Sequence, residues 1–168
     1  MRKIPVEIKS VDLGDAEGKP GICTENLNLV GLIPLITPRA LKNKLAASPS
    51  VLEGVARSRK EISDIIAGND HRMIVVAGPC SIHDPAEALE YADCLARLRN
   101  ELADELLILM RVYFEKPRTI VGWKGLISDP RMDGSSEIAY GLRTARNLLL
   151  KINSMGVPAA AEMLDPFV

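Results

Sequence analysis

Apolar and polar positions along the chain indicate an N-terminal part built from helices. Residues 1–20 show no periodicity and indicate an arm or a short edge strand. Thr37 and Ser48 each precede a proline, a combination that starts helices, so the sequence predicts helices over residues 37–47 and 48–68. We expect residues 1–70 to form this helical part, with its second helix supported by apolar residues at helical spacing.

The pattern changes after residue 70 to short apolar runs separated by helical patterns. Residues 73–77 and 106–113 are continuous apolar runs, as in strands that are buried on both faces. Residues 158–164, PAAAEML, indicate a third strand. Arg111 is the one charged residue inside the second run. Side chains alternate along a strand, so Arg111 shares a face with Leu107, Leu109 and Tyr113.

Two more helices are predicted between these strands. Asp84 and Glu87 are spaced as in a capping box, which opens a helix over residues 84–102. Ser135 or Ser136 is expected to cap the other helix, whose apolar positions follow directly.

This order of elements predicts an α/β fold with a parallel sheet and right-handed crossovers. A (β/α)₈ barrel typically needs about 250 residues. Residues 71–168 therefore form either a small open α/β domain or the first three strands of a truncated barrel.

Charge and hydropathy narrow the classes of partner. The formal net charge is -1, which gives no electrostatic reason to expect nucleic acid or an anionic membrane surface as a partner. No apolar run reaches the length of about 18 residues that a membrane span needs, and the N-terminus lacks the apolar core of a signal peptide. We expect a cytoplasmic protein, for which small anionic substrates remain open.

Chemically useful side chains fall at the ends of all three predicted strands. Cys80 follows the first strand, Arg111 and Lys116 lie at the end of the second, and Glu162 lies at the end of the third. Ligands of parallel sheets bind at the carboxyl ends of the strands. An arginine inside an apolar strand is costly unless it is paired, which favours a functional role for Arg111. Position alone leaves Glu162 open between a ligand-binding and a solvent-facing carboxylate, and Cys80 is by itself more typical of packing.

The segment over residues 114–134 shows neither helical nor strand periodicity. Connections of this length inside compact domains are usually functional or disordered. This one contains several lysines and arginines together with Trp123, the only tryptophan of the chain. The composition favours a loop folded over an anionic ligand, because lysine and arginine donate charge-assisted hydrogen bonds to phosphate and carboxylate. A solvated charged loop is the alternative.

Two stretches of sequence carry a family resemblance. VVAGPCSIHDP at residues 75–85 and MRVYFEKPRTIVGWKGLISDPRMDG at residues 110–134 closely resemble the metal-dependent, feedback-regulated 3-deoxy-7-phosphoheptulonate (DAHP) synthases. The 3-deoxy-octulosonate 8-phosphate synthases share the Gly-Pro-Cys step but not the YFEKPRT and GWKGL blocks. The resemblance implies a (β/α)₈ barrel. This chain would contain its N-terminal helical extension in residues 1–70 and about three βα units in residues 71–168.

The resemblance also implies roles for individual residues. Cys80 matches a ligand of a divalent metal ion, which can be Mn, Fe, Co or Zn. Arg111 and Lys116 match residues that hold phosphoenolpyruvate, and Glu162 matches a carboxylate that lines the same pocket. The site for erythrose 4-phosphate matches Arg118 and Thr119. The implied reaction joins these two substrates with water to give DAHP and phosphate, with the metal ion polarising the aldehyde of erythrose 4-phosphate.

The resemblance carries expectations for the whole protein as well. Members of the family are homo-oligomers, so a dimer or tetramer is expected, and an aromatic amino acid is a possible inhibitor. The family's other metal ligands lie further along the barrel than residue 168, so the isolated chain is expected to be inactive. Three alternatives therefore remain: part of a longer synthase, a non-catalytic remnant or regulatory partner subunit of the same family, or an enzyme like the 3-deoxy-octulosonate 8-phosphate synthases.

Overall fold

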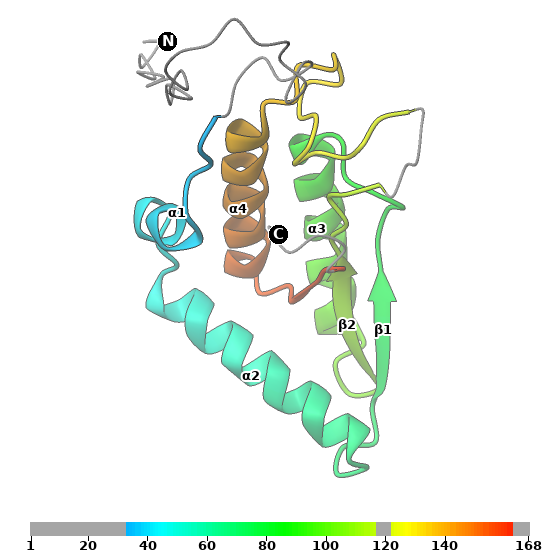
Figure 1. Ribbon diagram of the computed structural model, residues 1–168. Coiled ribbons are helices and arrows are strands. Elements are labelled where there is room, and N and C mark those ends of the chain that lie inside the picture. Colours follow the sequence, from blue (N-terminus) through cyan, green and yellow to red (C-terminus); the bar gives the residue numbers. More distant parts are fainter. Residues whose placement is uncertain (1–32, 117–121, 163–168) are drawn as a thin grey trace, which may run out of the picture. The chain divides into compact units, whose positions relative to one another are not determined.

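A computed structural model describes residues 33–116 and 122–162 of the chain. The described elements belong to one compact unit that begins at Thr37. The predicted arm at residues 1–20 lies outside the described residues. The elements of this unit can be followed in Figure 1. They are α1 (Pro38–Lys44), α2 (Pro49–Ile66), β1 (Met73–Ala77), α3 (Pro85–Glu101), β2 (Leu106–Arg111), α4 (Ile138–Ser154) and β3 (Ala159–Ala160).

The three strands form one parallel sheet in the order β1-β2-β3. In the register of the first pair, Met73 lies beside Leu106 and Ala77 beside Met110. The predicted α/β fold with a parallel sheet is therefore confirmed. The third strand is shorter than the predicted 158–164, because its ladder with β2 contains only Ala159 and Ala160, and residues from 163 onward lie outside the described part.

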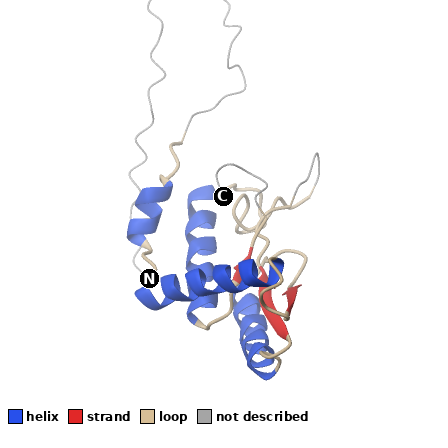
Figure 2. Cartoon of the chain, turned by 90° about the horizontal axis from the view of Figure 1, so that it is seen from below, coloured by secondary structure: helices blue, strands red, loops and turns tan. Residues whose placement is uncertain are grey.

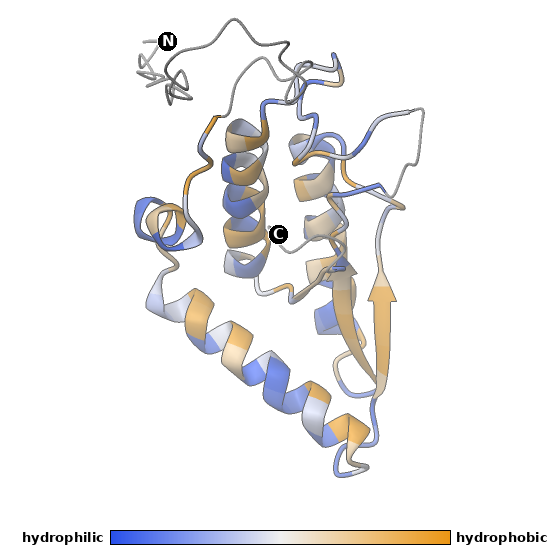
Figure 3. Cartoon of the chain, viewed as in Figure 1, coloured by the Kyte–Doolittle hydropathy of each residue, from blue (hydrophilic) through white to orange (hydrophobic). Residues whose placement is uncertain are grey.

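Two helices cover one face of this sheet. Helix α3 packs against β2 and α4, and α4 also contacts β3. Figure 2 shows the helices and strands from below, and Figure 3 shows how strongly apolar β1 and β2 are. Ile108, Met110 and Val112 belong to the core cluster that these helices form with the sheet, and Met110 is fully buried. The alternation expected along β2 is confirmed, because every second residue enters this cluster.

Helix α2 contacts α4 and β1 and is tied to the start of the sheet by ion pairs. Arg72, directly before β1, donates from Nη2 to Asp70 at 2.7 Å and lies 3.5 Å from Glu61 of α2. Arg99 of α3 lies 3.6 Å from the same glutamate and donates from Nη1 to the carbonyl oxygen of Gly156 at 2.9 Å. The hydrogen bond from Arg72 lowers the pKa of the Asp70 carboxyl to about 2. Four segments therefore meet at the amino ends of the strands through charged groups.

The predicted N-caps of the first three helices are present. The side chains of Thr37 and Ser48 accept from backbone N–H groups of α1 and α2, and Asp84 accepts from Ala86 and Glu87 of α3. The glutamate expected to complete a capping box at Asp84 instead lies 3.6 Å from His83, one turn before it. Helix α1 ends at Lys44 rather than at residue 47. The next residue, Leu45, is no longer helical, and its N–H donates to the carbonyl oxygen of Leu41.

The predicted serine cap of α4 is wrong. The residue before the helix is Glu137, and its side chain makes no capping hydrogen bond. Ser136 adopts a left-handed conformation with φ of 52°, which places it in the turn that leads to the helix rather than at its cap. The second strand also ends at Arg111 rather than at Tyr113, because the carbonyl oxygen of Tyr113 accepts from the N–H of Ile82 outside the ladder.

The division of the chain at residue 70 stays a prediction. Helices α1 and α2 belong to the same compact unit as the strands, and that unit begins at Thr37. Within the described residues, no helix has the length and apolar character that crossing a membrane requires.

Candidate anion-binding site at the carboxyl ends of the strands

The chain leaves β1 in close contact with the last residue of β2. A Cβ atom placed on Gly78 would lie 2.5 Å from the carbonyl oxygen of Arg111 and 2.8 Å from its Cβ. Any larger residue would push the two strand ends apart. Glycine at this position therefore lets the following segment, which carries Cys80, pass directly beside Arg111.

The segment after Gly78 is anchored at its far end by a buried residue. Ile82 is 2% exposed, and its N–H donates to the carbonyl oxygen of Tyr113 at 2.8 Å. Cys80 lies between these two fixed points and is exposed. A short loop held at both ends positions Cys80 over the end of β2.

Arg111 faces away from the helix layer, because Met110 and Val112 on either side of it point into that layer. Its Nη2 donates to the carbonyl oxygen of Cys80 at 3.2 Å, and its guanidinium carbon lies 3.9 Å from the centroid of the Tyr113 ring. The ring and the carbonyl hold the guanidinium plane in one orientation. The Nε atom is buried and makes no hydrogen bond within the described residues. A buried donor without an acceptor is costly, and an anionic oxygen would satisfy it.

Lys116 reaches the same loop from beyond the end of β2. Its Nζ donates to Sγ of Cys80 at 2.7 Å. Arg111 and Lys116 therefore bring two positive charges to one residue, on its backbone oxygen and on its sulfur. Two cations beside one open loop form a surface that attracts a phosphate or a carboxylate.

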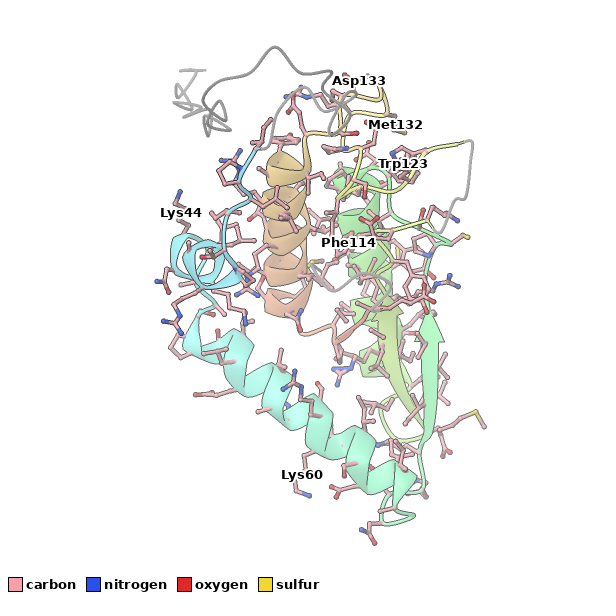
Figure 4. The ribbon with its side chains drawn as sticks, in the orientation of Figure 1. Lys44, Lys60, Phe114, Trp123, Met132 and Asp133 are labelled. Atoms are coloured by element: carbon pink, nitrogen blue, oxygen red, sulfur yellow. The ribbon has the colours of Figure 1, made fainter. Side chains whose placement is uncertain are left out.

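Backbone hydrogen bonds join the segment around Lys116 to residues 124–126 of the loop that follows it. The N–H of Lys116 donates to the carbonyl oxygen of Lys124 at 3.0 Å, and the N–H of Leu126 donates to that of Phe114 at 2.6 Å. Leu126 and Ile127 are buried in the core with Phe114. Figure 4 labels Phe114 and Trp123, whose indole N–H donates to the carbonyl oxygen of Asp129 at 2.7 Å. The predicted loop over residues 114–134 is thus partly core, because apolar residues inside its second half anchor it.

Glu162 lies near the same edge of the sheet but in a different group of residues. It lines a narrow cleft together with Tyr113, Glu115 and Ala161, and its side chain is exposed. Within the described residues it makes no hydrogen bond or ion pair with Arg111 or Lys116. The structure therefore joins Cys80, Arg111 and Lys116 directly and places Glu162 in a separate cleft with Tyr113 and Glu115. Arg118 and Thr119 lie outside the described residues.

The described residues do not provide a complete set of ligands for a divalent ion. No group of three or more His, Cys, Asp or Glu side chains that could hold a metal ion occurs in residues 33–116 and 122–162. Protein sites for such ions usually use three or more ligands. His83 lies next to Glu87 of α3 and not with the groups that contact Cys80. Cys80 is thus a single candidate ligand in the part of the chain that is described.

Sequence reasoning placed Tyr113 on the face of Arg111 without giving it a role, and it missed Ser128. The Tyr113 ring lies against the Arg111 guanidinium, as the alternation of side chains allows. Ser128 donates to Oε2 of Glu115 at 2.9 Å. Its sequence position carries no signal of this contact, since the pairing of Glu115 with Gly125 brings the two together.

Comparison with known proteins gives the family of this chain. Residues 44–168 match the model of the DAHP synthetase I family. A protein of Amycolatopsis methanolica named phospho-2-dehydro-3-deoxyheptonate aldolase is 49% identical over 157 residues, which cover 94% of this chain and 76% of that relative. The chain belongs to the DAHP synthetase I family.

This chain is also similar to longer proteins, of which it covers a smaller share. The phospho-2-dehydro-3-deoxyheptonate aldolase of Escherichia coli K12 named Phe-sensitive is 57% identical over 141 residues, which cover 84% of this chain and 40% of that relative. The solved structure of phospho-2-dehydro-3-deoxyheptonate aldolase from Francisella tularensis SCHU S4 has a TM-score of 0.80 and 50% identity, covering 83% of this chain and 41% of that one. The chain therefore spans about 40% of the length of these two relatives.

Proposed function

We propose that this chain contributes the phosphoenolpyruvate-binding part of a DAHP synthase. Such an enzyme condenses phosphoenolpyruvate with erythrose 4-phosphate and water to give DAHP and phosphate, the first step toward the aromatic amino acids. The observation that carries the proposal is the meeting of Arg111 and Lys116 at Cys80, where two cations at the end of β2 contact the loop that follows β1. Family membership and the names of the relatives support it.

Each cation has a distinct task in this proposal. Arg111 is fixed in orientation by the Tyr113 ring and the Cys80 carbonyl, so its remaining donors bind an anionic oxygen with little loss of conformational freedom. Lys116 supplies a mobile point charge that exchanges its sulfur partner for a substrate oxygen. Together they offset the charge of phosphoenolpyruvate and hold it beside the second anionic substrate.

The remaining expected residues keep proposed roles. Glu162 lines the same edge of the sheet and is proposed to border the phosphoenolpyruvate pocket, and Arg118 and Thr119 are proposed to receive erythrose 4-phosphate. Cys80 is proposed to supply one ligand of a divalent ion, with its other ligands outside the described residues. The chemistry that the ion supplies when bound is polarisation of a carbonyl oxygen.

Several properties of the whole protein are proposals of the same kind. The fold is proposed to be part of a (β/α)₈ barrel, in line with the parallel sheet and the Francisella structure. We propose a cytoplasmic homo-oligomer, a dimer or a tetramer, that an aromatic amino acid inhibits. The name Phe-sensitive of the Escherichia coli relative supports the last point.

A chimera provides a setting in which activity can be measured. In it, residues 44–162 of this chain replace the matching segment of the Phe-sensitive Escherichia coli relative. Arg111→Lys in this chimera keeps the charge and loses the planar fork. We expect kcat/KM for phosphoenolpyruvate to fall by roughly 30- to 1000-fold, equivalent to about 2–4 kcal/mol, without a loss of thermal stability.

The matched control is Arg97→Lys, the same substitution at an exposed position of α3 that pairs with Asp93. It is expected to leave kcat/KM unchanged. A fall of less than about threefold for Arg111→Lys would give Arg111 a structural role only, through Cys80 and Tyr113, and would contradict the proposed role.

A further inference from the structure

The loop over residues 122–134, called here the pinned loop, is held in shape by its own hydrogen bonds. The Trp123 indole N–H donates to the carbonyl oxygen of Asp129, and the Asp129 carboxylate accepts from the N–H of Gly134 at 3.2 Å. The N–H of Asp129 donates to the carbonyl oxygen of Gly125 at 2.9 Å. Asp129 is 9% exposed, so these bonds are shielded from water.

The pinned loop is also fixed to the core at two backbone contacts. A Cβ atom on Gly125 would overlap the carbonyl oxygen of Phe114, and one on Gly141 of α4 would overlap that of Ile127. Leu126 is buried between these two contacts and is 1% exposed. The pinned loop is therefore packed tightly between α4 and the backbone at residues 114–116, and its position is fixed relative to both.

The contact between this loop and Glu115 bears on Lys116 because the two residues are neighbours in an extended segment. Glu115 pairs with Gly125 in an antiparallel bridge, and successive side chains of extended backbone point to opposite sides. The Glu115 carboxylate accepts from Ser128 at 2.9 Å on one side, and the Lys116 ammonium donates to Cys80 at 2.7 Å on the other. The hydrogen bond that holds the Glu115 side chain therefore also fixes the backbone rotation that aims Lys116 at Cys80.

We propose that Ser128 is a positioning residue, which acts through Glu115 to hold Lys116 against Cys80. The inference rests on the proposed function, since that function gives Lys116 its role, but the position of Lys116 can be measured without any activity. Ser128 does not touch the substrate in this proposal. Its hydroxyl sets the rotation of residues 115 and 116, and the bridge to Gly125 keeps that segment extended.

The test uses the whole 168-residue chain and o-phthalaldehyde. This reagent joins one primary amine and one nearby thiol into a fluorescent isoindole with release of two water molecules. Lys116 and Cys80 are close enough to react, at 2.7 Å. The fluorescence that disappears in both Cys80→Ser and Lys116→Gln is the signal of this pair.

We expect Ser128→Ala to lower the initial rate of isoindole formation by about fivefold or more, because residues 115 and 116 sample more rotations once the hydrogen bond from Ser128 is lost. Ser128→Thr and Ser128→Val form a matched pair of equal shape, of which only threonine keeps the hydroxyl. The threonine variant is expected to react like the unmodified chain and the valine variant like Ser128→Ala. Ser135→Ala, in the turn that follows the pinned loop, is the control and is expected to change nothing.

Thermal unfolding followed by circular dichroism separates positioning from folding. If Ser128→Ala or Ser128→Val does not fold, Glu115→Met removes the same hydrogen bond from the acceptor side, because methionine has a similar length and no carboxylate oxygen, and it is expected to lower the rate as well. Equal rates in a folded Ser128→Val, or in a folded Glu115→Met, and the unmodified chain would overturn the proposal. A loss of synthase activity by the chimera with a normal isoindole rate would instead count against the proposed function alone.

Discussion

At the scale of single residues, the sequence identified side chains whose chemistry is unusual for their place in the pattern. Arg111 is conspicuous because it is a charge inside an apolar strand, and the structure places it beside Cys80, as its position at a strand end indicated. The alternation of side chains placed Tyr113 on the face of Arg111 but gave it no role, and Ser128 could not be found from the sequence. The importance of both residues comes from what the fold brings next to them.

Charge at the amino ends of the strands gives a prediction for stability. The hydrogen bond from Arg72 lowers the pKa of Asp70 from 3.8 to about 2. A carboxyl with a lowered pKa in the folded state stabilises that state above its unfolded pKa and loses this contribution as the pH falls toward 2. Asp70→Asn is therefore expected to lower the urea midpoint of unfolding at pH 7 and to make little difference at pH 2.

The control for this experiment is Asp104→Asn, at an exposed position before β2. Asp104→Asn is expected to leave the difference between the urea midpoints at pH 7 and pH 2 the same as in the unmodified chain. An Asp70→Asn midpoint that falls equally at pH 7 and pH 2 would show that the ion pair with Arg72 does not contribute through its charge.

At the scale of elements, the sequence predicted most starts of helices and strands and fewer of their ends. Pro38, Pro49 and Pro85 mark three helix starts by local chemistry, and the structure begins helices at all three. The cap expected at Ser135 or Ser136 failed because two serines before a periodic pattern do not determine backbone conformation, and Ser136 lies in a left-handed turn. Strand ends depend on partners distant in sequence, so the end of β2 at Arg111 was not predictable locally.

The close approach of the ends of β1 and β2 gives a prediction at this scale. Gly78→Ala would place a Cβ 2.5 Å from the carbonyl oxygen of Arg111, and it is expected to destabilise the fold by about 1–3 kcal/mol. Gly54→Ala is the matched control, since a Cβ there meets nothing within 4 Å and the site lies inside α2. That variant is expected to be more stable than the unmodified chain by up to about 1 kcal/mol.

Thermal midpoints of the two glycine variants, recorded side by side, decide this prediction. A Gly78→Ala chain as stable as the unmodified one would mean that the strand ends can separate without cost. The position of Cys80 over Arg111 would then need another explanation.

At the scale of the whole molecule, the sequence predicted the architecture better than the site. Alternating apolar runs and helical patterns predicted a parallel α/β sheet, and the order β1-β2-β3 confirms it. The shape of the pinned loop was not predictable, because Gly125 and Gly141 act through backbone contacts with Phe114 and Ile127 that no local pattern indicates. That the sheet is part of a (β/α)₈ barrel stays a prediction, since the described residues contain three strands.

The central claim is that this chain supplies the substrate-binding part of a DAHP synthase. Its most direct test is the rate of DAHP formation by the chimera that carries residues 44–162 in the Phe-sensitive Escherichia coli relative, measured with phosphoenolpyruvate, erythrose 4-phosphate and manganese. The account predicts a rate within about tenfold of the parent enzyme, a difference of about 1.4 kcal/mol or less in activation free energy. A chimera that folds like its parent and forms no DAHP would contradict it.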